Sequence, residues 1–336
     1  GAVPGAGFFS GREIWYFFVK NGLYGLYGIM ITALFFIVIA PIIFTIGKAL
    51  KINNYHQLFY NYLPRFIALI FDIIFSVFFL GSFAIMLAGS GTLLEESLGI
   101  NYLWGIIINI LIVFFTLILK VEGIYNVNSY LIPFILIISV FIIIKFIPEV
   151  SLSFIKEIIF DKIKITYEGN WFRDSILYGS YNLSMASGTM IGIAAREKET
   201  TVITGSVLGG LVLFSLNILI FIGLKTAYYQ TPSEQIPMLY LAFINGRAFY
   251  HLYFTGLFFA MLSTAIANCY ALTQRFKFFG IKYIWSLIII ILIVFPFLKL
   301  GFSYLIETLY PLFGYMGFII LTYILFKYLF DVVTSK

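Results

Sequence analysis

The stretch GAVPGAGFFSGREIWYFF, residues 1–18, places three glycines and a proline in its first seven residues, ahead of an apolar run that contains Arg12 and Glu13. Glycine and proline are poor residues for a helix interior, because glycine loses backbone entropy on folding and proline lacks an amide donor. The residues that follow are apolar enough for a segment in or near a bilayer. We therefore predict a helix that is broken at GAVPGAG at membrane depth.

The composition of the chain indicates an integral membrane protein. Of its 336 residues, 62% are hydrophobic and 11% are charged, whereas soluble domains carry about 25% charged residues. The apolar runs have the length of spanning helices rather than the alternating pattern of a barrel. The net charge of +6 is modest. We expect a lipid bilayer and a small-molecule substrate as partners, no nucleic acid, and a prokaryotic cytoplasmic membrane as the location.

Motifs for catalysis or for metal binding are missing from the sequence. Cys269 is the single cysteine, so no internal disulfide can form, and His56 and His251 are far apart in the chain. The sequence contains no GxxxxGK phosphate loop, no HExxH and no GxSxG. We therefore expect that the protein is not an enzyme and holds no cofactor.

The apolar runs predict an all-α protein with ten spanning helices. The first is the opening segment, and the others lie near 23–46, 64–88, 101–119, 127–147, 174–195, 200–226, 248–272, 281–298 and 302–328. With the N-terminus inside, the inner loops and tail hold eleven Lys and Arg residues and the short outer loops hold four. The excess of positive charge on one side predicts that both termini are cytoplasmic.

The start of the chain falls inside the broken segment, and no initiator methionine precedes it. We interpret the chain as a fragment that lacks the front half of its first spanning helix. A cleaved signal peptide is the alternative, although the first residues resemble membrane interior rather than a mature exported N-terminus.

Two breaks at matching positions divide the chain into two halves. We predict a first five-helix repeat at 1–147, an extracellular amphipathic connection at 148–172 and a second repeat at 173–329. The second repeat would open with a broken sixth helix at YGSYNLSMASGTMIG, residues 178–192. Matching breaks are typical of transporters with inverted repeats, and backbone leaves the helix at membrane depth only where it lines a cavity. The alternative is that small residues merely permit close helix packing.

The eighth predicted span carries a cluster of oxygen atoms. Ala260, Ser263 and Thr264 share one helix face, and hard cations such as Na⁺ prefer oxygen ligands. The alternative is that both hydroxyls bond back to their own helix, as Ser and Thr often do in membrane helices.

Three stretches resemble a known family. GAVPGAGFFSGREI resembles the GAGFxSGxE signature of the YkvI-like membrane proteins, and IPMLYLAF and FFAMLSTAIANCY are similar to later segments of that family. The resemblance covers nearly the whole chain in segment order. It implies the amino acid–polyamine–organocation superfamily and its LeuT-type fold, with five plus five helices and broken first and sixth helices. Its motifs are weak indicators of the substrate.

The resemblance also implies a coupling ion. In sodium-coupled members, one Na⁺ bridges the unwound first helix and the eighth helix. Carried over by motif, the carbonyls of Gly1, Pro4 and Ala260 and the hydroxyls of Ser263 and Thr264 would bind it, with no metal beyond Na⁺. The proline departs from the family pattern. Some proton-coupled relatives have a lysine on the fifth helix, and NVNSYLIPF, at residues 126–134, has none, which favours Na⁺.

The substrate would lie between the two breaks, and a charge pair would close the site. A substrate carboxylate could bind at the first break, and polar groups of the second break would face it. Tyr178 and Tyr181 could supply aromatic walls or a gate, and the alternative is that both merely pack in the core. The residues expected to bind substrate are Gly5, Ala6, Gly7, Phe8, Gly179, Ser180, Tyr181, Asn182 and Ser184. Related transporters close an outer gate with a pair between the first and tenth helices, which would here be Arg12–Glu307. Alternatively, Arg12 pairs with Glu13 or with phospholipid.

Three further features are open to two interpretations each. Asp72 lies within the third span, where Arg65 could pair with it in a structural or inner-gate ion pair, or where the acid could carry a proton. Asn217 could serve a second ion. The aromatic segment at 226–252 resembles the outer lid of this fold, and the alternative is an interfacial loop with an aromatic belt.

These features together predict a secondary active transporter. We expect a Na⁺-coupled symporter of a small solute, such as an amino acid or a related zwitterion or anion, that works by alternating access without covalent chemistry. The alternative is a transporter-like nutrient receptor that binds without net transport, since spore germinant receptor subunits resemble this fold. A membrane-embedded enzyme would need a catalytic cluster at one membrane face. The sequence does not determine the oligomeric state.

Overall fold

The computed structural model describes residues 5–49, 60, 63–119, 124–146, 169–194, 198–227, 234–278 and 280–334. Every regular element in these ranges is helical, and they contain no strand. The first predicted span corresponds to three short elements, namely α1 (Ala6–Ser10), α2 (Arg12–Phe17) and the 3₁₀ turn η1 (Val19–Asn21). Each of the other predicted spans coincides with one longer helix.

Nine longer helices and one short helix follow within the described part of the chain. They are α3 (Tyr24–Ala49), α5 (Arg65–Leu98), α6 (Tyr102–Ile118), α7 (Ile124–Phe146), α9 (Trp171–Ala194), α10 (Glu199–Thr226), α11 (Pro237–Ile244), α12 (Arg247–Phe278), α13 (Tyr283–Leu298) and α14 (Phe302–Thr334). Five of them, α3, α5, α10, α12 and α14, are long and apolar enough to cross a membrane. These five identify a membrane protein, while the total of ten spans stays a prediction.

The first span is interrupted at Gly11, which lies outside the predicted break. Gly5 is extended, α1 begins at Ala6, and Gly11 then adopts a left-handed conformation with φ of 80° that ends α1 and begins α2. A side chain at Gly11 would be strained there and would also collide with Met238 of α11. The sequence interpretation placed the break at GAVPGAG, whose residues 1–4 lie outside the described residues. It did not anticipate the interruption at Gly11.

The predicted break in the sixth span is wrong. Helix α9 is continuous from Trp171 to Ala194 and includes the whole stretch 178–192. The small residues in it serve packing instead. Gly179 lies against Phe35 of α3, and Gly317 of α14 lies against Ser180 and Ser184. The hydroxyl of Ser184 donates to the carbonyl of Tyr181 within the same helix, so the polar side chains do not interrupt it.

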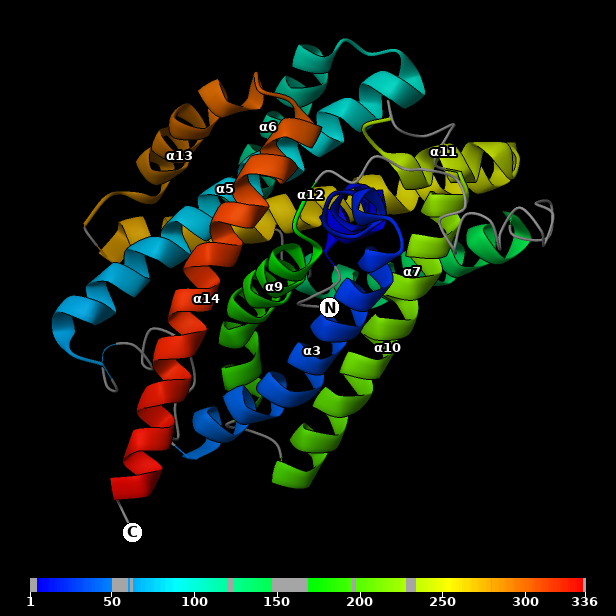
Figure 1. The fold of residues 1–336 in the computed structure, drawn as a ribbon. Helices are drawn as coiled ribbons and strands as arrows, with labels where there is room; N and C mark the ends of the chain where they lie inside the picture. Colours follow the sequence, from blue (N-terminus) through cyan, green and yellow to red (C-terminus); the bar gives the residue numbers. More distant parts are fainter. Residues whose placement is uncertain are drawn as a thin grey trace.

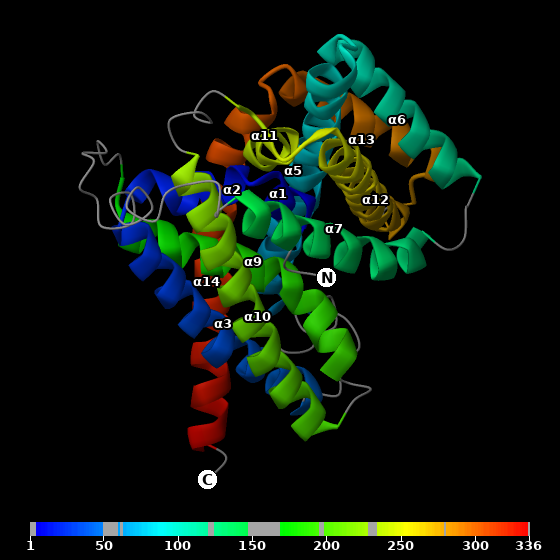
Figure 2. The same ribbon diagram turned by 90° about the vertical axis from the view of Figure 1, so that its right-hand side faces the viewer.

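The helices form two groups that the first-span elements join. Helices α3, α9, α10 and α14 pack together in the lower part of Figure 1, and α5, α6, α7, α12 and α13 pack together above them. Figure 2 shows the same division from the side, with α1 and α2 in the middle of the molecule. Helix α1 contacts α5, α7 and α12 of one group, and α2 contacts α9, α10 and α14 of the other. The bend at Gly11 is therefore the point at which the chain passes between the groups.

Two other predicted segments can be compared with the structure. Most of the predicted connection at 148–172 lies outside the described residues, and α9 already begins at Trp171. The predicted lid segment contains α11, which packs against α12, α7 and α1. Gly11 contacts Met238 of this short helix, so α11 covers the interruption of the first span.

Candidate functional site

A buried carboxylate, Glu13, lies next to the interruption at Gly11. Its side chain belongs to the first turn of α2 and is almost fully buried, with 4% of the residue exposed. The hydroxyl of Tyr181 on α9 donates a hydrogen bond to Oε2 of Glu13, and Tyr310 of α14 is hydrogen-bonded to the same carboxyl group. Three elements that are far apart in sequence thus converge on one acid.

Gly7 of α1 completes the surroundings of Glu13. A methyl group at Gly7 would lie on top of Oε1 of Glu13 and 2.7 Å from the hydroxyl of Tyr310. The hydrogen atom of glycine leaves room for both polar groups to pass over the α1 backbone. The acid and the glycine therefore depend on each other, although they lie on opposite sides of the bend.

Aromatic rings enclose the carboxyl group. The rings of Tyr181 and Tyr310 are stacked, with centroids 4.8 Å apart and planes at 13°. Tyr178 packs edge-on against Tyr181 at 5.5 Å and against Phe17 at 5.3 Å. These rings surround the buried acid with largely apolar surface, and Tyr181 and Tyr310 direct their hydroxyl groups to it.

The predicted charge pair forms directly beside this acid. The Nη2 atom of Arg12 lies 2.6 Å from Oε1 of Glu307 on α14, and Nη1 donates to the carbonyl of Glu234 at 3.3 Å. Neighbouring residues of a helix point about 100° apart, so Arg12 turns toward α14 while Glu13 turns inward. The alternative pairing of Arg12 with Glu13 is not among the ion pairs of the described residues. The role of the pair as a gate stays a prediction.

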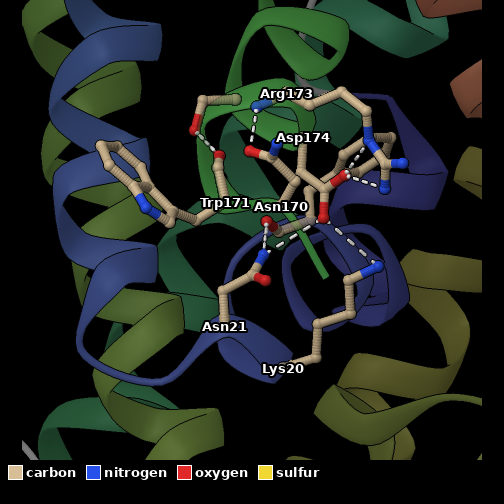
Figure 3. Close-up of polar contacts among 8 residues, drawn as sticks. Lys20, Asn21, Asn170, Trp171, Arg173 and Asp174 are labelled. Atoms are coloured by element: carbon tan, nitrogen blue, oxygen red, sulfur yellow. Dashed lines mark hydrogen bonds and ion pairs between the residues drawn. The ribbon is translucent and has the colours of Figure 1, made fainter. Parts of the chain in front are cut away.

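A second buried acid, Asp174, fastens the end of η1 to the start of α9 (Figure 3). Its side chain is 2% exposed and lies 3.4 Å from Nζ of Lys20 and 2.9 Å from Nη2 of Arg173, and it accepts from Nδ2 of Asn21 at 3.2 Å. Burial lowers the pKa of Lys20, and the nearby Asp174 opposes that shift. Because Asp174 has two cationic partners, we interpret this cluster as structural.

The predicted ion ligands are only partly described. Ser263 and Thr264 on α12 both donate to the carbonyl of Ala260, at 3.1 and 2.8 Å, so the three oxygen atoms are clustered. Gly1 and Pro4 lie outside the described residues. The described part of the chain contains no group of three or more His, Cys, Asp and Glu that could hold a metal ion. An oxygen-only site for Na⁺ stays a prediction.

The predicted substrate residues of α9 do not share one face. Tyr178 and Tyr181 face α2 and the buried acid, whereas Gly179 faces α3 and Ser180 with Ser184 faces α14. The amide of Asn182 donates to the carbonyl of Tyr178. The fully buried hydroxyl of Ser180 has no hydrogen-bond partner in the described residues. The structure therefore brings the two tyrosines to the first span and separates the other α9 residues from it.

The predicted substrate residues of the first span lie around the start of α1. Gly5 precedes the helix, and its carbonyl accepts from the amide of Phe9 at 3.3 Å. Ala6 and Phe8 are buried, and Gly7 lies under the carboxyl group of Glu13. Their role in substrate binding stays a prediction.

The acid of the third span has a different partner from the one the sequence suggested. Asp72 on α5 pairs with Arg275 on α12, which also donates to Ser76, so the interpretation with Arg65 is wrong. Asn217 on α10 lies 3.4 Å from the hydroxyl of Tyr178 and donates to the carbonyl of Leu213. The helix periodicity pointed to a partner on the same face of α5, whereas the real partner comes from a helix about 200 residues later.

Two proteins of Bacillus subtilis (strain 168) are similar to this chain over nearly their whole length. The "Uncharacterized membrane protein YkvI" is 28% identical over 322 residues, which cover 94% of this chain and 90% of that protein. The "Uncharacterized protein YyaD" is 25% identical over 335 residues, which cover 97% and 93%. No family model matches the chain. The chain is an integral membrane protein. The likeness and the apolar helices support that class, and the superfamily stays a prediction.

The sequence interpretation overlooked Glu13 as a site residue and treated it only as a rival partner for Arg12. One signal was present, since an acid inside an apolar membrane segment is a functional hypothesis by default. A second signal was the adjacent glycine pattern, because acids are accommodated where small residues leave room. Tyr181 was among the predicted substrate residues, whereas nothing in the sequence singled out Tyr310 from the 24 tyrosines of the chain.

Proposed function

We propose that this protein is a secondary active transporter that moves a small solute across the membrane by alternating access. The observation that carries the proposal is the interrupted first span. It leaves one helix group and joins the other at Gly11, next to a buried acid and an ion pair. Backbone that leaves the helix inside a membrane protein is typical of solute sites in transporters.

The pattern of helix contacts supports an inverted repeat of five plus five helices. We match α1–α2, α3, α5, α6 and α7 in order with α9, α10, α12, α13 and α14. Contacts of α5 with α6 and with α13 then recur as contacts of α12 with α13 and with α6. The contact of α7 with α12 recurs as that of α14 with α5, and α3–α10, α5–α12 and α6–α13 are self-paired contacts. Recurrence of this kind is what a two-fold related repeat requires, and it favours the predicted halves at 1–147 and 173–329.

Ion pairs at two levels support alternating access. Arg12–Glu307 joins the first span to α14 on the side of η1. Asp72–Arg275 joins the first part of α5 to the last part of α12, and we place it toward the opposite membrane face. An ion pair whose access to water changes with conformation favours one of two states over the other. In the proposed cycle, separation of Arg12 from Glu307 admits solute from the η1 side.

Sodium coupling remains part of the proposal. The hydroxyl of Tyr253 on α12 donates to the carbonyl of Phe9 and so ties α12 to α1. About two turns further along α12 lie Ala260, Ser263 and Thr264, whose oxygen atoms are of the type that Na⁺ prefers. Bound Na⁺ would supply a positive charge between the first span and α12, where Gly1 and Pro4 would complete the ligand set.

We propose an amino acid or a related zwitterion or anion as the solute. Its carboxylate would bind near Gly5, Ala6, Gly7 and Phe8, and the two tyrosines of α9 that face the first span would contact the rest of it. The packing of Gly179 against α3 argues against a direct contact of that residue with the solute. No covalent step is proposed.

The test of this function is ligand-dependent thermal stability of the purified protein. A ligand that binds the folded state alone stabilises it by about 2.7 kcal/mol at 100 times its Kd. We expect one or more amino acids to raise the melting temperature in Na⁺ but not in K⁺ at equal ionic strength. The double variant Ser263→Ala/Thr264→Ala should lose that shift.

The matched control is Thr255→Ala, which removes an exposed α12 hydroxyl that also bonds back to its own helix. This control should keep the full Na⁺-dependent shift. A ligand shift that is equal in Na⁺ and K⁺ would contradict sodium coupling. A ligand shift without flux in vesicles would favour the nutrient receptor instead.

A further inference from the structure

The first-span acid Glu13 has no cationic partner among the ion pairs of the described residues, although it is almost fully buried. A charged carboxylate in such a site costs several kcal/mol unless a cation or a proton neutralises it. We propose that Glu13 is a proton-binding site, which holds a proton in the closed arrangement and releases it when the first span opens to water. This inference rests on the proposed transport function and adds H⁺ to its cargo.

The cations on the neighbouring elements are placed elsewhere. Arg12 on the same helix binds Glu307, and Lys20 of η1 lies beside Asp174 and over the ring of Tyr16 at 3.5 Å. On α10, Lys225 lies over the ring of Phe221 at 5.7 Å. The groups that contact the Glu13 carboxyl from α9 and α14 are the hydroxyls of Tyr181 and Tyr310, and the hydroxyl of Tyr178 donates to Asn217 instead.

The hydrogen bonds around Glu13 are compatible with one bound proton. The hydroxyl of Tyr181 donates to Oε2. The other oxygen, Oε1, lies over Gly7 beside the hydroxyl of Tyr310, which can accept from a protonated Oε1 because a phenol both donates and accepts. A neutral carboxyl group with one donor and one acceptor is therefore satisfied by these two tyrosines without a cation.

The route for the proton follows from the order of residues in α2. Arg12 and Glu13 are adjacent, so any movement of α2 that separates Arg12 from Glu307 also displaces Glu13 from its tyrosines. Water that enters there can take the proton from Oε1, and the carboxylate that remains is solvated. Return of α2 to the closed arrangement requires that Glu13 takes up a proton again.

The experiment is infrared spectroscopy of the purified chain in lipid nanodiscs at neutral pH. The probe is the C=O stretching band of a protonated carboxylic acid, measured for the native chain, for Glu13→Gln and for the matched control Glu95→Gln, which replaces an exposed acid at the end of α5. We expect the band in the native chain, a clear decrease of the band in Glu13→Gln and no such decrease in Glu95→Gln. A band that Glu13→Gln leaves unchanged would overturn the proposal.

A second variant keeps the test decisive if Glu13→Gln fails to fold. Tyr181→Phe removes the donor to Oε2 and keeps the ring, so the band should remain and shift to higher frequency. An unshifted band in Tyr181→Phe would contradict the geometry. Both measurements need no solute, so the absence of flux in vesicles would contradict the transport function alone, and the absence of the band would contradict the proton site alone.

Discussion

Gly7 is the residue at which the architecture of the site is most sensitive to a single methyl group. In Gly7→Ala the new Cβ would overlap Oε1 of Glu13 and press on the hydroxyl of Tyr310. Overpacking of a tight site costs about 1–3 kcal/mol, so we expect a clear decrease in the melting temperature of the ligand-free protein.

The matched control is Gly5→Ala, two residues earlier. A methyl group at Gly5 has no atom within 4 Å, and the φ of Gly5 is −83°, which suits any residue. We expect its stability to stay within about 0.5 kcal/mol of the native protein, as for most unconstrained surface changes. Equal destabilisation by both variants would contradict the close packing of Glu13 over Gly7.

At the residue scale, the sequence predicted contacts best where few partners were available. Glu307 is the only acidic residue of the predicted span at 302–328, so Arg12 had few candidate partners, and the two are paired. Asp72 was assigned to Arg65 by helix periodicity, whereas its partner Arg275 comes from a distant helix. Periodicity describes one helix at a time and carries no information about which helices become neighbours.

At the scale of the element, α9 depends on close approach to α14. In Gly317→Ala the new methyl group would meet the hydroxyl of Ser184 and lie 2.7 Å from the carbonyl oxygen of Ser180. Because backbone cannot yield as a flexible side chain can, we expect a loss of about 1–3 kcal/mol. Denaturation in detergent, monitored by circular dichroism, measures this loss of stability.

The matched control for this change is Gly209→Ala in α10. A methyl group at Gly209 has no atom within 4 Å, and alanine is favoured over glycine in a helix interior by roughly 0.5–1 kcal/mol. We expect this variant to be as stable as the native protein or slightly more stable. If Gly317→Ala were equally harmless, the α9–α14 contact would be looser than described.

The two glycine-rich segments show why element breaks are hard to predict from composition. Both segments are rich in small residues. Gly11, however, adopts a positive φ that only glycine accommodates readily. In α9, Gly179 keeps the helix and fits the ring of Phe35 instead. Whether a glycine bends its helix or admits a neighbour is decided by tertiary packing, which the sequence pattern alone does not contain.

At the scale of the whole molecule, the proposed cycle requires α2 and α14 to separate. In the double variant Arg12→Cys/Glu307→Cys, a short reducible bifunctional thiol reagent can join the two new thiols. We expect this cross-link to lower solute uptake at least tenfold, and we expect reduction of the cross-link to restore uptake. The single native cysteine, Cys269, is fully buried, so it should react slowly. The Arg12→Cys variant alone is the control, and unchanged uptake after complete cross-linking would contradict the gate.

The sequence predicted the positions of the long helices better than it predicted the site. The positions of the long helices could be predicted because uninterrupted apolar runs have few alternatives in a bilayer. The meeting of Gly7, Glu13, Tyr181 and Tyr310 could not, because it depends on how two helix groups pack around the bend at Gly11.

Solute uptake into proteoliposomes tests the central claim of transport most directly. The solute is the one that raises the melting temperature. The vesicles carry either an inward gradient of Na⁺ or H⁺ or equal concentrations of that cation on both sides. The account predicts accumulation above equilibrium with an inward cation gradient, and simple equilibration without one. Specific binding of the solute with no accumulation under either gradient would contradict transport and identify the protein as a receptor.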